Sequence, residues 1–218
     1  MSTRAESGAT RGGSALRLRR TAIIAAPILA AALIVVGFFT DPDIGASGRK
    51  LAREYAENPG WIQISALSFH FAYALLIIPA FALAASVRGR GVWLANVALL
   101  FAVLGLTTLP GLLVTDFYDV AIYGKLGGDA WQTVNDRLEE LPGTIVFLLS
   151  TIVSATLALP TALFALFRAG RLPWWPAPAL LVAEIAARAV PGGIGLLLLA
   201  AALVVLGLWL QRALPAET

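Results

Sequence analysis

The distribution of hydrophobic residues divides the chain into six apolar stretches separated by polar segments. Each stretch is 18 to 25 residues long, and about 20 helical residues suffice to cross the roughly 30 Å hydrocarbon core of a bilayer. The pattern therefore predicts an all-α, polytopic transmembrane helical bundle. The expected spans are residues 21–39, 62–86, 92–115, 143–167, 173–190 and 194–211.

The last two spans come from one apolar region of 39 residues, which is too long for a single crossing. The sequence Val190-Pro191-Gly192-Gly193 divides this region, because proline and paired glycines end helices and permit a tight turn. An alternative arrangement has five spans, with residues 173–190 forming a re-entrant segment.

Two polar segments, residues 47–60 and 129–143, carry apolar residues at helical spacing. These are Leu51 and Tyr55 in the first segment, and Trp131, Val134, Leu138 and Leu141 in the second. Both segments are predicted to be short amphipathic helices on the outer surface. They either cap the bundle or form a lid or docking surface.

The distribution of charge predicts the orientation, because Lys and Arg prefer cytoplasmic loops. With the N-terminus inside, the cytoplasmic segments hold ten basic and two acidic residues, and the outer segments hold five basic and ten acidic residues. The cytoplasmic basic residues are Arg4, Arg11, Arg17, Arg19, Arg20, Arg88, Arg90, Arg168, Arg171 and Arg212. We expect both termini in the cytoplasm and an acidic outer face.

The polar N-terminal segment, residues 1–20, is expected to be a disordered basic cytoplasmic tail. A cleaved signal peptide is the rival interpretation, but the apolar stretch that follows is longer than a usual signal core and lacks a convincing cleavage site. Residues 212–218 are expected to form a second cytoplasmic tail.

Composition narrows the classes of chemistry. The chain is 59% hydrophobic and 13% charged, whereas about 25% of the residues in a soluble domain are charged. It has no cysteine and one histidine, which excludes disulfides, Cys-ligated metals, bis-His haem and multi-His zinc within one chain. We expect no cofactor, no metal and no nucleic-acid partner. The alanine- and arginine-rich usage indicates a GC-rich bacterial genome, and hence the plasma membrane.

Polar side chains from four spans are expected at a similar depth in the outer leaflet. Counted inward along the helices, His70 lies about 12 Å deep and Glu184 about 9 Å deep. Thr107, Thr108, Ser150 and Thr151 belong to the same layer.

Glu184 needs a partner, because an isolated charge among lipid tails costs about 3 kcal/mol on insertion scales. Arg188 lies one turn away on the same helical face, so an intrahelical pair is one solution. A sharper hypothesis brings Glu184 to His70 across the bundle, with Tyr73 one turn below. That arrangement would pass a proton or hold a cationic group.

A second polar group lies at the outer end of the third span. Asp116, Tyr118, Asp119 and Tyr123 either line the mouth of a cavity, where they would bind a cation, or are simply solvated. The stretch does not supply the 6 to 8 oxygen ligands, roughly, that calcium requires.

No catalytic signature accompanies these residues. G-x-S-x-G and H-E-x-x-H are absent, so an intramembrane serine hydrolase using Ser150 or Ser154 with His70 is a minor alternative. The prolines within two spans, Pro79 and Pro160, favour a small-solute or proton-coupled transporter using the His70/Glu184 layer. The pattern as a whole best fits a non-catalytic assembly, regulatory or sensor component.

Two cytoplasmic hairpins flanked by arginine, "SVRGRGVW" and "FRAGRLPWW", precede the terminal stretch "GIGLLLLAAALVVLGLWLQRAL". In these features the chain resembles a group of uncharacterised bacterial six-span integral membrane proteins. The resemblance covers most of the chain and implies the fold, but no activity and no site residues. The expected partners are the lipid bilayer and either a second copy of the chain or another membrane protein.

Overall fold

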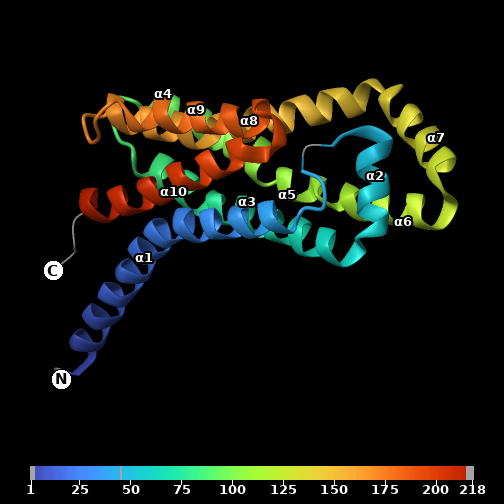
Figure 1. Ribbon diagram of the computed structural model, residues 1–218. Helices are drawn as coiled ribbons and strands as arrows, with labels where there is room; N and C mark the ends of the chain where they lie inside the picture. The colour runs from blue at the N-terminus through green and yellow to red at the C-terminus, as the bar shows by residue number, and fades with distance from the viewer. Residues whose placement is uncertain (1–2, 45, 215–218) are drawn as a thin grey trace.

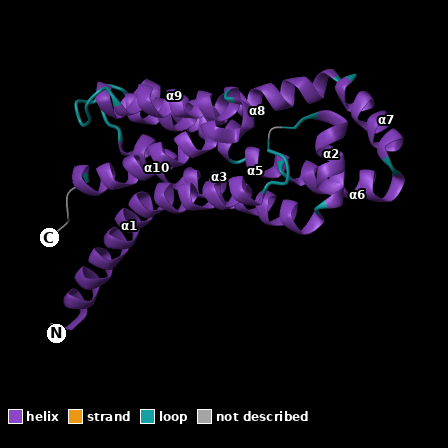
Figure 2. Ribbon diagram, in the orientation of Figure 1, coloured by secondary structure: helices purple, strands orange, loops and turns teal. Residues whose placement is uncertain are grey.

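The computed structural model describes residues 3–44 and 46–214, with side chains from residue 14 onward. Every regular element in these ranges is helical (Figures 1 and 2). The helices are α1 (Thr3–Thr40), α2 (Gly48–Glu57), α3 (Pro59–Ser86), α4 (Val92–Phe101), α5 (Leu109–Leu112), α6 (Val114–Leu126), α7 (Gly128–Glu139), α8 (Pro142–Arg168), α9 (Pro176–Ala189) and α10 (Ile194–Ala213). A π-helical turn, η1 (Ala102–Leu106), follows α4, and a 3-10 turn, η2 (Pro191–Gly193), precedes α10.

Within the described residues, five helical segments are long and apolar enough to cross a membrane, which indicates a membrane protein. They are Ser14–Thr40, Pro59–Ser86, Val92–Leu126, Pro142–Arg168 and Pro191–Ala213. The fold is therefore all-helical and polytopic, as predicted. The sixth expected span, α9, has only 14 residues and is about 21 Å long, shorter than the hydrocarbon core.

Helix α1 begins well before the expected first span. Residues 3–20 continue α1 as helix, and α1 extends away from the bundle toward the N-terminus (Figure 1). Extending an existing helix avoids the cost of nucleating a new one. Arg20 also fixes this helix to the C-terminal end of α10, because its guanidinium donates to the carbonyl oxygens of Gln211 and Leu214 at 3.1 and 3.0 Å. Residues 1 and 2 of the expected tail lie outside the described residues.

The third predicted span is interrupted. Helix α4 passes into η1 and the short α5 before α6 begins, so residues 92–115 are not one regular helix. Pro110 explains the break, because proline has no N–H to donate and its ring clashes with the preceding turn. Pro79 and Pro160, in contrast, lie within continuous helices.

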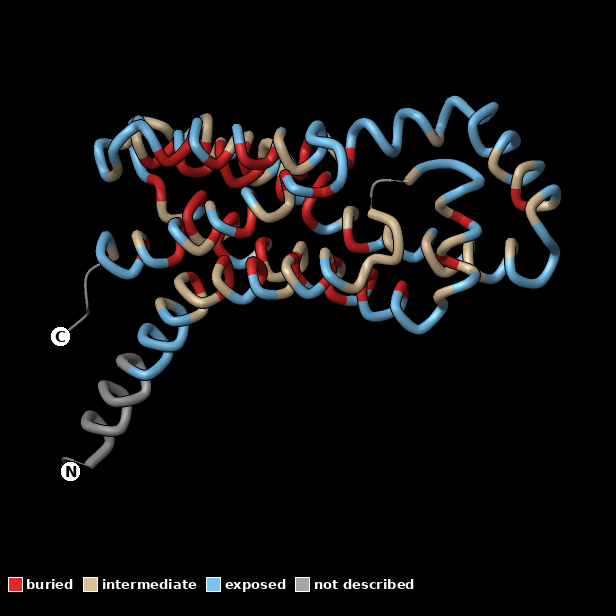
Figure 3. Tube along the Cα trace, in the orientation of Figure 1, coloured by how far each residue is buried: buried red, intermediate tan, exposed pale blue. Residues whose placement is uncertain are grey.

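Small residues bring the helices together. Helix α1 packs between α3 and α10, α9 packs between α10 and α8, and α4 packs on α8 and α3. The buried positions along these contacts are mainly alanine and leucine (Figure 3). A side chain at Gly105 would collide with the backbone of Ala155 on α8, and one at Gly195 would collide with the carbonyl of Ala186 on α9.

The end of the bundle remote from the N-terminus carries α2, α6 and α7 (Figure 2). Both α2 and α7 pack on α6. Tyr55 of α2 and Trp131 of α7 are buried, whereas Val134, Leu138 and Leu141 are exposed. Of the predicted apolar face of α7, only Trp131 is therefore covered by the protein itself.

Candidate functional site

Glu184 and Arg188 form an ion pair within α9. The Glu184 side chain is 2% exposed, and its Oε2 lies 2.6 Å from Nη1 of Arg188, which is 26% exposed. The same guanidinium nitrogen donates to the carbonyl oxygen of Glu184 at 2.8 Å. The spacing of four residues on a helix places the two side chains together, and the predicted intrahelical pair is confirmed.

His70, on α3, has a different partner from the one expected. Its Nδ1 lies 3.0 Å from the carbonyl oxygen of Pro110, in the interrupted segment. Within residues 14–44 and 46–214, no hydrogen bond or ion pair joins His70 to Glu184. The expected contact is therefore not formed, because the helix break at Pro110 presents a carbonyl group that the imidazole satisfies.

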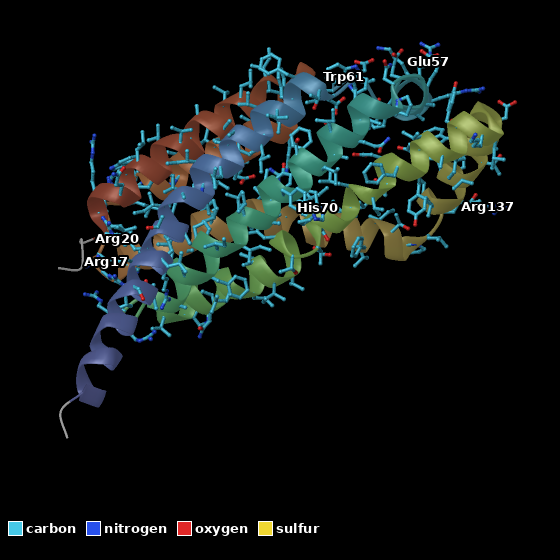
Figure 4. All side chains as sticks on the ribbon, turned by 90° about the horizontal axis from the view of Figure 1, so that it is seen from below. Arg17, Arg20, Glu57, Trp61, His70 and Arg137 are labelled. Atoms are coloured by element: carbon cyan, nitrogen blue, oxygen red, sulfur yellow. The ribbon has the colours of Figure 1, made fainter. Side chains whose placement is uncertain are left out.

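The hydrogen bond to Pro110 determines how the ring of His70 is protonated. A carbonyl oxygen only accepts, so Nδ1 carries a proton. In the neutral imidazole, Nε2 is then the acceptor nitrogen. The ring of Phe71 contacts His70 edge-on, with centroids 5.1 Å apart. Figure 4 shows His70 within the bundle, between the basic end marked by Arg17 and Arg20 and the end that carries Glu57 and Arg137.

Two threonines join α8 to the helix break. The hydroxyl groups of Thr108 and Thr151 lie 3.2 Å apart, and Thr108 also donates to the carbonyl oxygen of Leu104 at 2.6 Å. Thr151 is buried. The polar layer predicted from depth is therefore assembled in part, because His70, Thr108 and Thr151 gather around the interrupted segment.

Thr107 and Ser150 do not join this group. Both are exposed, and their hydroxyls bond back to carbonyl oxygens of their own helical segments, those of Val103 and Phe147. Such local bonds satisfy a hydroxyl in an apolar environment without a partner from another helix.

Tyr73 belongs with the ion pair rather than with His70. It lies one turn along α3 from His70, is half-buried, and is close enough to Glu184 and Arg188 for its hydroxyl to interact electrostatically with both. The described part of the bundle thus holds two separate polar groups, one around the helix break and one formed by the ion pair of α9 together with Tyr73.

A third polar group lies at the end that carries α2 and α7. Asp41, just beyond the membrane segment of α1, accepts from the hydroxyl of Tyr55 at 3.3 Å and from that of Ser65 at 3.4 Å. Burial raises the pKa of Asp41 above its ordinary value of 3.8, and these hydrogen bonds oppose the shift. Burial likewise raises the pKa of Tyr55, with the charge of Asp41 adding to the effect.

Of the residues predicted to line an outer mouth, the two aspartates lie near this group. Asp119 accepts from Nε1 of Trp131 at 2.6 Å, which ties α7 to α6. Asp116 is half-buried and lies in the electrostatic field of Asp41 and Asp119. Tyr118 is exposed, and Tyr123 is half-buried.

Sequence reasoning missed Asp41, Tyr55 and Ser65 as members of this group. Two features of the sequence could have indicated this group: Asp41 follows closely after the first apolar stretch, and Tyr55 lies on the apolar side of the next predicted helix. Among the described residues, no group of three or more His, Asp or Glu side chains is placed to hold a metal ion.

No protein-family model, curated protein or solved structure matches the chain. The resemblance to uncharacterised bacterial six-span membrane proteins stays a prediction.

Proposed function

We propose that this protein is a non-catalytic component of a membrane assembly, and that it binds another membrane protein through the corner between α7 and α8. A second copy of the chain is the alternative partner. The proposal rests on the exposure of apolar residues at this corner.

The first turns of α8 are exposed on every side. Residues 145–150 are all exposed, including Val146 at 67% and Leu149 at 59%. Successive helical residues point about 100° apart, so four of them sample all faces of the helix. Elsewhere in α8, buried alanines and leucines pack against α4 and α9.

The apolar surface of this corner continues from one helix into the next. Val134 and Leu138 lie four residues apart on α7, Leu141 lies in the connection just before α8, and Ile145 and Leu149 lie four residues apart on α8; all five are exposed. Exposed apolar residues beside polar ones are characteristic of a surface that contacts another protein or the membrane. A membrane helix of the partner would cover it.

The proposal includes six crossings, with α9 as the short sixth. Trp175, at the start of α9, contacts Trp209 near the end of α10, with ring centroids 6.0 Å apart. At the other end of the hairpin, Gly193 packs against Ile44 and Phe38, beside the end of α1. These contacts at the two ends of the hairpin support a crossing by α9, and tilt or local thinning of the bilayer would accommodate its short length. The arginines at the N-terminal end favour a cytoplasmic location for that end, in a bacterial plasma membrane.

Site-specific photo-crosslinking in native membranes tests the assembly. A photoreactive residue replaces Val146 at the corner or, as the control, Leu198, an equally apolar residue on α10 that is 53% exposed. We expect a discrete protein adduct from position 146, with the same mass from positions 138 and 149, and none from position 198. Lipid adducts alone from all four positions would overturn the proposal.

Transport is the second candidate function, and the interrupted segment favours it. Helix breaks and π-helical turns at membrane depth recur where backbone groups serve a binding site, and His70 and Thr108 lie at this break. Flux into proteoliposomes driven by a proton gradient tests it, with His70→Asn as the variant. The hydrolase alternative gains nothing, because the described contacts of Ser150 and Ser154 include no bond to His70.

A further inference from the structure

The basic end of the bundle contains a pocket with an unusual lining. Its volume is about 340 Å³, and it lies between α1, α3 and the segments that follow α8 and α10. Four arginines line it, together with apolar residues, and none of its lining residues is acidic. The arginines are Arg19, Arg20, Arg88 and Arg171.

Backbone carbonyl groups hold three of these arginines in place. Arg20 donates to the carbonyl oxygen of Leu214, Arg171 donates to that of Ser86 at 3.0 Å, and Arg88 donates to that of Ala85 at 2.7 Å. Each bond uses part of a guanidinium that has five N–H donors. The bonds orient the side chains and leave donors free, and they do not neutralise the charge.

Within the part of the chain whose side chains the structure describes, residues 14–44 and 46–214, no carboxylate pairs with the arginines of the pocket. Each ion pair of the described residues involves other basic side chains: Arg49, Lys50, Arg53, Arg137 and Arg188. The four arginines of the pocket therefore repel one another without an offsetting carboxylate among these described side chains. An anion in the pocket would convert this repulsion into charge-assisted hydrogen bonds.

The lining also has apolar residues on the side of the expected span. Ile23 lies one turn along α1 from Arg19 and Arg20, toward the bundle, and Ala82 contributes from α3, whereas Leu16 lies one turn in the opposite direction. A ligand that fits this lining has a phosphate at one end and hydrocarbon at the other. Basic pockets between transmembrane helices bind phospholipid headgroups by this combination.

We propose that this pocket binds the phosphate-bearing headgroup of an anionic phospholipid, with the start of an acyl chain against Ile23 and Ala82. The inference uses the proposed insertion of the bundle in a membrane, but not the proposed partner at the corner between α7 and α8. Its site lies at the opposite end of the molecule (Figure 1).

Native mass spectrometry of the purified full-length chain in detergent tests the proposal. Phosphatidylglycerol and phosphatidylcholine are added separately, and the fraction of protein that retains each lipid is measured. We expect preferential retention of phosphatidylglycerol. Arg19→Gln and Arg88→Gln should each weaken it roughly fivefold, as expected for one basic side chain near an anionic lipid.

Arg137→Gln is the matched control, because it removes the same charge from α7 at the other end, where Arg137 pairs with Glu140. It should leave the retention of phosphatidylglycerol unchanged. A thermal unfolding curve verifies that each variant is folded. Arg19→Gln should not disturb the fold, because the described backbone bonds of the pocket arginines come from Arg20, Arg88 and Arg171.

Inorganic phosphate distinguishes the lipid from a free anion. If inorganic phosphate displaces phosphatidylglycerol no better than sodium chloride at the same ionic strength, the lipid proposal stands. If phosphate binds with the same dependence on Arg19 and Arg88 while the two lipids are retained equally, the pocket is a soluble-anion site and the proposal is overturned. Equal effects of Arg19→Gln and Arg137→Gln would also overturn it.

Discussion

The guanidinium of Arg188 lies 2.6 Å from the carboxylate of Glu184, one turn away on α9, and the carboxylate is almost completely buried. A buried carboxylate costs free energy unless it is paired. Removing one partner therefore destabilises the protein more than removing both. The charged residues of α9 are therefore compatible with its position inside an apolar bundle.

Removal of Arg188 alone should destabilise the protein strongly. Arg188→Leu leaves an unpaired buried carboxylate, and we expect a loss of about 3 kcal/mol in the free energy of unfolding. The double variant Glu184→Leu/Arg188→Leu should recover most of it, because neither charge is then left behind. Thermal unfolding in detergent measures both.

An exposed pair provides the comparison. Arg137 and Glu140 are similarly close, at 2.8 Å, but their side chains are 78% and 63% exposed. Arg137→Leu should change the free energy of unfolding by less than about 1 kcal/mol. Equal losses from Arg188→Leu and Arg137→Leu would contradict the argument from burial.

His70 should act through the donor at Nδ1. His70→Ala leaves the carbonyl of Pro110 without its partner and should cost about 1 to 3 kcal/mol of stability. The side-chain amide of asparagine places a donor at nearly the same distance from the backbone, so His70→Asn should lose less. If the two variants unfold at the same temperature, the bond to Pro110 contributes nothing and the histidine acts only by filling space.

Asp41 should make stability depend on pH in an unusual direction. Burial raises its pKa in the folded state above the ordinary 3.8, so the folded protein binds more protons than the unfolded chain. The contribution of Asp41 to stability is therefore present below pH 3.8 and is lost as the pH rises through the folded-state pKa.

Asp41→Asn removes this dependence while retaining an acceptor for Tyr55. The variant should therefore gain stability relative to the natural chain as the pH rises from about 4 to neutrality. Unfolding temperatures measured across this range give the difference. Asp136→Asn, at an exposed position on α7, serves as the control and should run parallel to the natural chain at every pH.

The sequence predicts much of this architecture because membrane insertion imposes length and hydropathy on each helix. The ends of α3 and α8, and the turn at residues 190–193, all lie close to the predicted boundaries. The interruption within residues 92–115 was not predicted, because hydropathy does not report whether backbone hydrogen bonding is continuous. Gly105 and Pro110 lie at the break, but they occur within a run whose hydropathy is continuous.

The partners of the polar residues depended on geometry between helices. The pair Glu184–Arg188 could be predicted because both residues lie on one helix, where the spacing determines the contact. The bonds of His70 to Pro110 and of Asp41 to Tyr55 join different helices. Depth along each helix could be counted from the sequence, but rotation about the helix axis and the local break could not.

Gly105 should be highly sensitive to substitution. It lies in η1, where α8 approaches so closely that an added Cβ would meet the backbone nitrogen and Cα of Ala155 rather than a flexible side chain. Gly105→Ala must therefore move η1 away from α8 and disturb the contact between Thr108 and Thr151.

Overpacking in a well-packed interior typically costs about 1 to 3 kcal/mol, and the backbone collision at Gly105 should place Gly105→Ala at the upper end of this range. Gly111→Ala is the matched control, because Gly111 lies six residues further along, in α5, with nothing within 4 Å of an added Cβ. It should unfold at the temperature of the natural chain or slightly above it. Equal unfolding temperatures for the two variants would show that α8 does not lie against η1 as the structure places it.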